Sequence, residues 1–139
     1  VMFVPYGCMV DEFQHEVYDH PEMSPAERKK VWKKLEKIYK PHMDYDGLPF
    51  FEKGAFWQKQ HHIYSFPLYY IDYVIAQLCA FEYKAWMDRD YKAAWKSYLK
   101  LCRMSASEFH TELLKEAGLD SPFADGTIRK IVENLKKEV

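Results

Sequence analysis

The hydrophobic residues of this chain recur at the three- and four-residue spacing of helices, and no stretch shows the alternation of a strand. The pattern predicts helices at about 5–19, 25–39, 91–103 and 106–116, a last helix from about 127, and a long apolar helix between 67 and 87. Local signals agree: Ser24 and Glu27 form a capping box, and Asp90 can cap the helix after it. The predicted fold class is all-α.

Each predicted helix carries an apolar stripe that we expect to be buried. The stripes are Val10, Phe13 and Val17 in the first helix, Val31, Leu35 and Ile38 in the second, Ala94, Trp95, Tyr98 and Leu101 in the helix at 91–103, and Ile128, Ile131 and Leu135 in the last. A second capping box, from Ser105 to Glu108, predicts the start of the helix at 106–116, and Gly118 predicts its end.

The stretch from 41 to 54 is predicted to be a loop. The aromatic side chains in and after it are expected to pack against the core: Phe50, Phe51, Phe56 and Trp57. Gly54 permits a tight bend before a short helical piece that leads to His61. The run from Asp44 to Gly47 resembles the start of a calcium loop, but its glycine and glutamate stand at the wrong positions, so we reject a calcium site.

The apolar helix between 67 and 87 is the element around which the others are expected to pack. Its main polar residues, Asp72, Gln77 and Glu82, are five apart, so each is rotated by about 140° from the last and no polar face results. A helix that is apolar on all sides lies in the centre of a larger protein or in a membrane. Asp72 inside a membrane span would cost roughly 2.5–3.5 kcal/mol, so we expect a buried helix and no membrane association.

Composition excludes few classes of function. The 139 residues suffice for one folded unit, so we treat 1–139 as a single helical fragment. Aromatic residues make up 17% of the chain, which therefore either buries an aromatic core or needs another part of a larger protein to cover it. A formal net charge of −1 gives no reason to expect nucleic acid as a partner, and the lysine-rich helix at 25–39 is interpreted as a solvated surface.

Three cysteines, Cys8, Cys79 and Cys102, are far apart and form no C-x-x-C pair. Because no basic and apolar signal sequence opens the chain, they predict reduced, mostly buried thiols in a cytoplasmic protein. The first five residues, Val-Met-Phe-Val-Pro, do not resemble a natural translation start. We therefore expect further residues of the protein to precede Val1.

The residues suited to catalysis gather around the start of the apolar helix. They are His61, His62, Tyr64, Tyr69, Tyr70 and Tyr73. Tyrosine hydroxyls and histidine N–H groups can stabilise an oxyanion that develops on a carbonyl. Tyr69 and Tyr73 are four apart and are expected on one helix face. The alternative interpretation is an aromatic core whose hydroxyls bond to the backbone.

A metal site within the chain is not predicted. Adjacent histidines such as His61 and His62 cannot easily bind one ion, and no carboxylate lies at ligand spacing. Of the functions considered for this pair, a haem or copper site is therefore the least supported. His15 and His20 are five apart, whereas the H-E-x-x-H motif of zinc peptidases needs histidines four apart on one helix face. We interpret both as solvated or capping histidines.

Three runs of the chain resemble the C-terminal part of oligoendopeptidase F-type zinc metallopeptidases, which are relatives of thimet oligopeptidase: VPYGCMVDEFQHEVY, KPHMDYDGLPFFEKGAFWQKQHHIYSFPLYYIDYVIAQLCAFEY and YLKLCRMSASEFHTELLKEAGLDSPFADGTI. The resemblance covers nearly the whole chain, through loops as well as apolar runs. It implies a multi-helix C-terminal portion of a zincin-type helical oligopeptidase that hydrolyses peptide bonds in short peptides. Because the chain has no H-E-x-x-H, the zinc ligands and the general-base glutamate are implied to precede Val1, and the chain alone is expected to be inactive.

The resemblance also implies roles for residues of this chain. They are His62, Tyr73, Tyr70 and His61 as catalytic residues that face the zinc and the substrate, and Tyr64 and Tyr69 as substrate-binding residues. Relatives of thimet oligopeptidase place a tyrosine where this chain, counted from His61, has Phe66, and Tyr64 or Tyr69 would replace that hydroxyl. The implied partners are an oligopeptide substrate and the N-terminal remainder of the same enzyme.

A different class of function stays open, namely a non-enzymatic helical domain that binds another protein. Its binding surface would be the lysine-rich helix at 25–39 or exposed aromatic residues. Both classes predict no peptidase activity for this chain alone. They differ once the N-terminal part is added, because only the first predicts zinc-dependent peptide cleavage.

Overall fold

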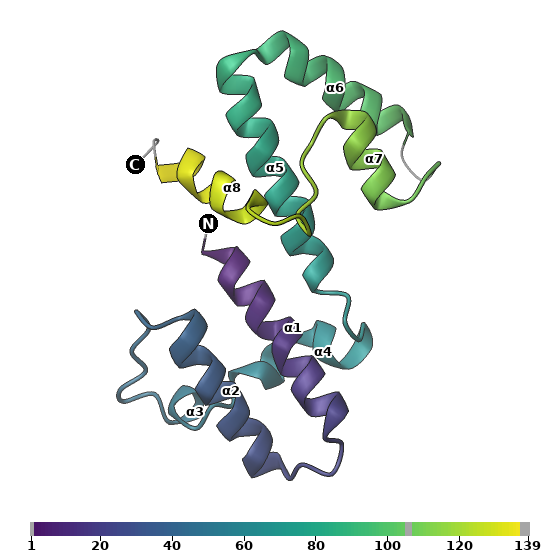
Figure 1. The fold of residues 1–139 in the computed structure, drawn as a ribbon. Coiled ribbons are helices and arrows are strands. Elements are labelled where there is room, and N and C mark those ends of the chain that lie inside the picture. Colours follow the sequence, from purple (N-terminus) through teal and green to yellow (C-terminus); the bar gives the residue numbers. More distant parts are fainter. Residues whose placement is uncertain (1, 105–106, 137–139) are drawn as a thin grey trace. The chain divides into compact units, whose positions relative to one another are not determined.

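The computed structural model describes residues 2–104 and 107–136, which form helices joined by short connections (Figure 1). The helices are α1 (Phe3–Asp19), α2 (Pro25–Tyr39), α3 (Pro49–Glu52), the 3-10 helix η1 (Phe56–Lys59), α4 (His61–Ser65), α5 (Ile71–Arg89), α6 (Tyr91–Met104), α7 (His110–Ala117) and α8 (Thr127–Lys136). These residues include no strand, so the all-α prediction is confirmed. The chain divides into two compact units, residues 1–74 and 75–139. The grouping of 1–139 as a single fragment stays a prediction.

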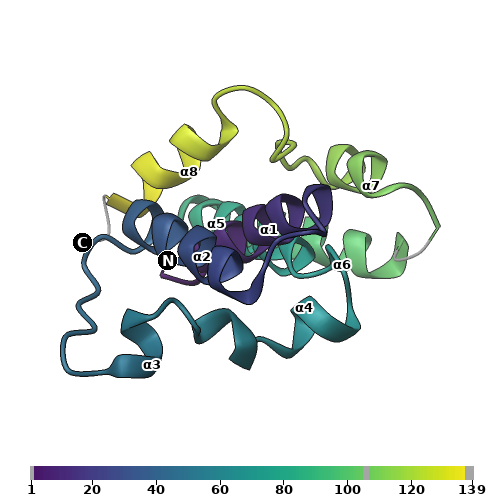
Figure 2. The same ribbon diagram turned by 90° about the horizontal axis from the view of Figure 1, so that it is seen from below.

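The first unit is built on α1 and α2, which lie side by side (Figure 1 and Figure 2). Its buried core consists of Met9, Val10, Phe13, Trp32, Leu35, Trp57 and Ile63. The ring centroid of Phe13 lies 5.1 Å from that of Trp32 and 5.2 Å from that of Trp57. Aromatic pairs at such distances add to the stabilisation that burial alone provides. The first unit therefore buries an aromatic core of its own.

Helix α2 begins where the sequence predicts, because its first turn carries its own cap. The hydroxyl of Ser24 accepts a hydrogen bond from the backbone N–H of Glu27 at 3.3 Å, and the Glu27 carboxylate accepts one from the N–H of Ser24 at 2.8 Å. The predicted stripe is only partly correct, since Leu35 is buried but Ile38 is 59% exposed. Trp32, which the stripe omitted, is fully buried, so the core-facing side of α2 runs through positions 32 and 35.

The stretch from 41 to 54 is mostly a loop, as predicted, but it contains the single turn α3. Trp57 in η1 is buried, and Phe56 packs against the core of the first unit. Phe50 was also expected against the core, but its side chain is exposed and contacts the ring of Phe51 instead. A one-turn helix has few side chains to bury, so only part of its aromatic surface is covered.

Gly54 makes the predicted bend, and its surroundings leave no space for a side chain. Its φ is +68°, and a Cβ atom there would lie 2.3 Å from the carbonyl oxygen of Lys29, whereas Gly47 has a φ of +76° and nothing within 4 Å. We expect Gly47→Ala to lower the free energy of unfolding by about 1–2 kcal/mol, because the left-handed backbone disfavours a Cβ. Gly54→Ala should lower it by a further ~1–3 kcal/mol, because the neighbouring backbone must also move. Urea unfolding of both variants measures the difference, and equal losses would contradict the clash.

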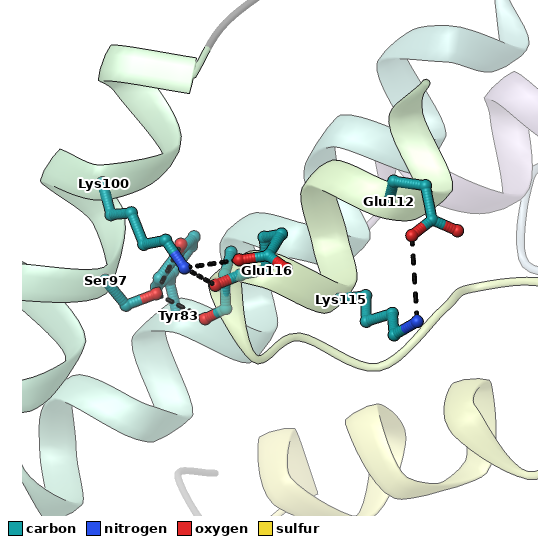
Figure 3. Close-up of polar contacts among 7 residues, drawn as sticks. Tyr83, Ser97, Lys100, Glu112, Lys115 and Glu116 are labelled. Carbon is teal, nitrogen blue, oxygen red and sulfur yellow. Dashed lines mark hydrogen bonds and ion pairs between the residues drawn. The ribbon is translucent and has the colours of Figure 1, made fainter. Parts of the chain in front are cut away.

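The second unit contains most of α5, together with α6, α7 and α8. Its buried core consists of Tyr83, Leu114, Ala117 and Leu119. Polar contacts join α6 to α5 and to the end of α7 (Figure 3): the Ser97 hydroxyl lies 3.1 Å from the Tyr83 hydroxyl of α5 and donates to the carbonyl oxygen of Ala117. Lys100 donates to the carboxylate of Glu116 at 2.7 Å and to its carbonyl oxygen at 2.8 Å.

Helix α6 begins as predicted, since the carboxylate of Asp90 accepts a hydrogen bond from the N–H of Ala93 at 3.1 Å. Its inward side was predicted less well. Ala94 is fully buried, but Trp95 is 42% exposed and Tyr98 is also exposed. The predicted apolar stripe of α8 is likewise only partly buried, because Ile131 is buried and Ile128 is exposed. Helical spacing identified the apolar faces but not how much of each face a neighbour covers.

Helix α7 begins later than predicted, at His110, and its N-cap position is occupied by Phe109. Ser105, the first residue of the predicted capping box, lies outside the described residues. The C-terminal prediction is confirmed, because Gly118 adopts a φ of +75° and its N–H bonds to carbonyls of the last turn.

The cysteines are free thiols, of which Cys8 and Cys79 are half-buried and Cys102 is exposed, so they are less buried than predicted. Within the described ranges, no helix combines the length and the apolar character that crossing a bilayer requires.

Candidate functional site

The predicted site residues lie on three consecutive pieces of the first unit. His61, His62 and Tyr64 belong to α4, Tyr69 and Tyr70 to the connection that follows, and Tyr73 to the first turn of α5. The long apolar helix was predicted to follow Pro67 directly, and this is wrong, because α5 begins only at Ile71. Leu68 adopts a φ of +57°, a left-handed conformation that no helix continues through. Tyr69 therefore precedes the helix and shares no helix face with Tyr73.

Four of the residues form one group of contacting rings, which we call the His–Tyr cluster: His62, Tyr69, Tyr70 and Tyr73. The ring centroid of His62 lies 4.8 Å from that of Tyr70 and 5.6 Å from that of Tyr73. Tyr73 lies 5.6 Å from Tyr70 and 5.3 Å from Tyr69. The turn between α4 and α5 thus brings an imidazole and three phenols together.

His61 and Tyr64 lie outside the His–Tyr cluster. The ring of His61 lies 6.0 Å from that of Phe66 and 6.4 Å from that of His62. Tyr64 stacks on Trp57 at 6.0 Å, with the two ring planes 25° apart. Of the two adjacent histidines, the structure therefore places His62 among the tyrosines, with His61 at the exposed edge.

Two hydroxyl groups of the His–Tyr cluster, those of Tyr70 and Tyr73, have pKa values raised above the ordinary value. Burial raises the pKa of Tyr70. A side-chain hydrogen bond with Tyr69 is the main cause that raises the pKa of Tyr73. Tyr73 is nevertheless 41% exposed, and His62 and Tyr70 are only half-buried. Tyr73 therefore lies at the surface of the first unit, whereas Tyr70 packs partly against its core.

Helix α1 anchors the segments on either side of the cluster. The fully buried side chain of Gln14 accepts a hydrogen bond from the N–H of Leu68 at 3.1 Å, which fixes the connection at its left-handed residue. The hydroxyl of Tyr18 donates to the carbonyl oxygen of Ile63 in α4 at 3.2 Å. Both hydrogen bonds involve backbone groups of the segment that carries the cluster, so they fix the path of that segment and thereby the positions of the cluster side chains.

A third anchor reaches His62 itself. The hydroxyl of Tyr6 donates to Oε1 of Gln60 at 2.7 Å, and Nε2 of the same amide lies 2.7 Å from Nδ1 of His62. Tyr6 also contacts the ring of Tyr70 at 6.0 Å. The imidazole is therefore connected both to the phenols and, through an amide, to α1.

Sequence reasoning missed Gln14, Tyr6 and Gln60. A signal existed for Gln14, which stands four residues after Val10 and three before Val17 and is thus a polar residue on the predicted apolar stripe. A buried polar residue must find a partner, so its position indicated a bond to another segment. Gln60 gave no comparable signal, because the residue before a histidine pair has no preferred role.

The His–Tyr cluster does not fit a metal site by itself. Its donors are one imidazole and three phenols, without the carboxylates, thiolates or further histidines that zinc prefers. Across the described residues, no three His, Cys, Asp or Glu side chains come together as a possible ligand set. His15 and His20 are exposed and lie beside Asp11 and Glu22 respectively. What the cluster offers chemically is a set of hydrogen-bond donors for an oxygen atom.

A hollow of about 540 Å³ lies elsewhere in the first unit, between α2 and the loop that follows it. Lysines and carboxylates line it together, among them Lys33, Lys37, Asp44 and Glu52. This mixture favours no single ligand charge. None of the His–Tyr cluster residues lines it, so the hollow and the cluster are separate features.

The comparisons with known proteins agree on one group. No protein-family model matches the chain, and no curated protein matches it. A solved structure described as a candidate oligoendopeptidase F is 49% identical to the chain, with a TM-score of 0.96, over 99% of this chain and 24% of the other. PZ peptidase A, solved with an inhibitor, is 48% identical with a TM-score of 0.94, over 98% and 24%. A candidate oligoendopeptidase F from Bacillus anthracis is 36% identical with a TM-score of 0.78, over 99% and 21%.

The chain thus spans about a quarter or less of each of these proteins. The identities run along nearly the whole chain and accompany the same helical fold, as the resemblance in the sequence implied. Over nearly its whole length, the chain is therefore similar to a part of the oligoendopeptidase F proteins, with 36% to 49% identity.

Proposed function

We propose that this chain is part of a zinc-dependent oligoendopeptidase that hydrolyses peptide bonds in short peptides, and that its His–Tyr cluster binds the substrate carbonyl. The observation that carries the proposal is the grouping of His62, Tyr70 and Tyr73, whose rings lie 4.8–5.6 Å apart while Tyr73 stays exposed. Similarity to PZ peptidase A and to two candidate oligoendopeptidases supports the peptidase class.

In peptide hydrolysis, negative charge develops on the carbonyl oxygen as the carbonyl carbon becomes tetrahedral. The hydroxyls of Tyr73 and Tyr70 and an N–H of His62 would donate to that oxygen, and preorganised donors cost no rearrangement at that moment. His61, at the edge of the cluster, would assist them. Tyr69 and Tyr64, both exposed, would contact the peptide beside the scissile bond.

Zinc belongs to this proposal as a group that another part of the enzyme holds, since the described residues offer no ligand set. When bound, zinc supplies Lewis-acid polarisation and an activated water. The residues of this chain would bind and orient the carbonyl. The N-terminal remainder of the enzyme is therefore the proposed partner of this chain, and a cytoplasmic location, expected from the free cysteines, is part of the same proposal.

The test is peptide cleavage by the full-length protein that contains this chain. We expect it to cleave short quenched-fluorescent peptides, to stop when a chelator removes zinc and to resume when zinc returns. His62→Ala should lower kcat strongly, because a donor to the oxyanion is lost. His42→Ala is the matched control, since this histidine is exposed in the loop after α2. A folded, zinc-loaded protein that cleaves no peptide would contradict the proposal and favour the alternative, a helical domain that binds another protein.

A further inference from the structure

We infer that Gln60 is a positioning residue that fixes which nitrogen of His62 carries the proton. The amide nitrogen of Gln60 lies 2.7 Å from Nδ1 of His62. An amide N–H can only donate, so Nδ1 accepts, and the ring proton of the neutral imidazole then lies on Nε2. His62 thereby presents an N–H donor, rather than a lone pair, at the nitrogen that Gln60 does not contact.

Tyr6 sets the orientation of the Gln60 amide. Its hydroxyl donates to Oε1 of Gln60 at 2.7 Å, which leaves the amide nitrogen facing His62. Burial raises the pKa of Tyr6 far above its ordinary value, so the hydroxyl keeps its proton. Among the described residues, Oε1 of Gln60 is the acceptor that this proton reaches. Reversing the amide would remove that acceptor from a half-buried hydroxyl, which costs free energy.

The backbone of Gln60 is held on both sides, so the side chain starts from a fixed point. Its N–H donates to the carbonyl oxygen of Trp57 at 3.0 Å, and its carbonyl oxygen accepts from the N–H of Ile63 at 3.1 Å. Trp57 and Ile63 both belong to the buried core. A series of hydrogen bonds therefore runs from Tyr6 on α1 through Gln60 to His62, and the backbone of Gln60 is bonded to residues of the buried core.

The consequence for catalysis rests on the proposed function. A carbonyl oxygen has lone pairs and no proton, so it binds an N–H donor and is repelled by a nitrogen lone pair. With the proton on Nε2, His62 is ready to donate before substrate arrives. With the proton on Nδ1, the ring would have to reverse its tautomer, and Gln60 would lose its hydrogen bond.

The experiment reads the tautomer directly in the full-length protein. With histidines labelled by ¹⁵N, nuclear magnetic resonance distinguishes a protonated ring nitrogen from an unprotonated one, and the His62 signals are those missing from His62→Gln. Gln60→Glu keeps the shape of the side chain but offers only acceptors, so it should move the proton to Nδ1. We expect kcat to fall by about 10–100-fold with little change in KM, the order of loss that follows when an outer partner fixing the tautomer of a functional histidine is removed.

Gln58→Glu is the matched control, because it makes the same charge change on an exposed residue two positions away. It should leave both the tautomer and kcat unchanged. A parent protein with the proton of His62 on Nδ1, or a tautomer that survives both Gln60→Glu and Gln60→Leu, would overturn the inference. A tautomer that moves while kcat stays constant would uphold the role of Gln60 and instead overturn the donor role of His62 in the proposed function.

Discussion

If the proposed function holds, Tyr73→Phe in the full-length protein is expected to lower kcat by about 10²–10³-fold, the usual cost of removing one donor to an oxyanion. The substitution keeps the ring and therefore its contacts with His62, Tyr70 and Tyr69. Only the hydroxyl is lost, and its pKa is raised, so it is a donor and not an anion at neutral pH. KM for short peptides should change much less, because the interaction forms mainly in the transition state.

The measurement is steady-state hydrolysis of a short peptide, with zinc content determined on the same samples. Zinc content should be unchanged, since a tyrosine hydroxyl is not among the ligands that zinc prefers. Tyr91→Phe is the matched control, because Tyr91 is an exposed tyrosine at the start of α6, outside the His–Tyr cluster. Full turnover of Tyr73→Phe would show that this hydroxyl takes no part in catalysis.

Phe13→Ala is expected to lower the free energy of unfolding of the chain by about 3–5 kcal/mol, the range for truncating a buried phenylalanine. Phe13 is 0% exposed and contacts both Trp32 and Trp57. Its removal leaves a cavity between α1, α2 and η1 that two large indole rings cannot easily fill. Because both neighbours are tryptophans, urea unfolding followed by tryptophan fluorescence reports on this site.

Phe50→Ala provides the comparison within the same unit. Phe50 is 47% exposed and contacts Phe51 at the surface, so its truncation should cost at most about 1 kcal/mol. If the two variants lost similar stability, Phe13 would not be the centre of the aromatic core. The comparison also separates burial from aromatic character, since the same side chain is removed in both.

Helix boundaries were predictable from the sequence wherever the signal was local. Ser24 and Glu27 bond within one turn, and so do Asp90 and Ala93, which explains why α2 and α6 begin where their caps stand. Gly118 ends α7 for the same reason, since only its own backbone has to adopt the left-handed conformation. Such signals need no knowledge of the rest of the fold.

Burial was less predictable, because it depends on neighbours. Ile38, Trp95 and Tyr98 stand at helical spacing with buried residues, yet all three are exposed. An apolar stripe is wider than the surface that one packed helix covers, so its margins stay accessible. Trp32 shows the opposite error, because it lies between the lysines of a basic helix and is fully buried.

For the candidate site too, local features were predictable from the sequence and the tertiary arrangement was not. The residue types around His61 and Tyr73 were visible in the sequence, because imidazoles and phenols in that density are uncommon. Their arrangement was not, since it depends on the left-handed backbone at Leu68 and on the partner of that residue, Gln14, 54 positions earlier in the chain. Contacts over such separations follow from the tertiary fold and leave no local pattern.

Helix α1 contributes three polar anchors, Tyr6, Gln14 and Tyr18, to the segment from Gln60 to Leu68. Each residue of an α-helix advances its direction by about 100°, so the three side chains can reach their partners only in one rotational phase. A single residue inserted between Tyr6 and Gln14 would therefore twist the donor to Gln60 away from the acceptor of Leu68. The geometry of the proposed site therefore depends on the register of α1, although this helix carries none of the side chains proposed to act in catalysis.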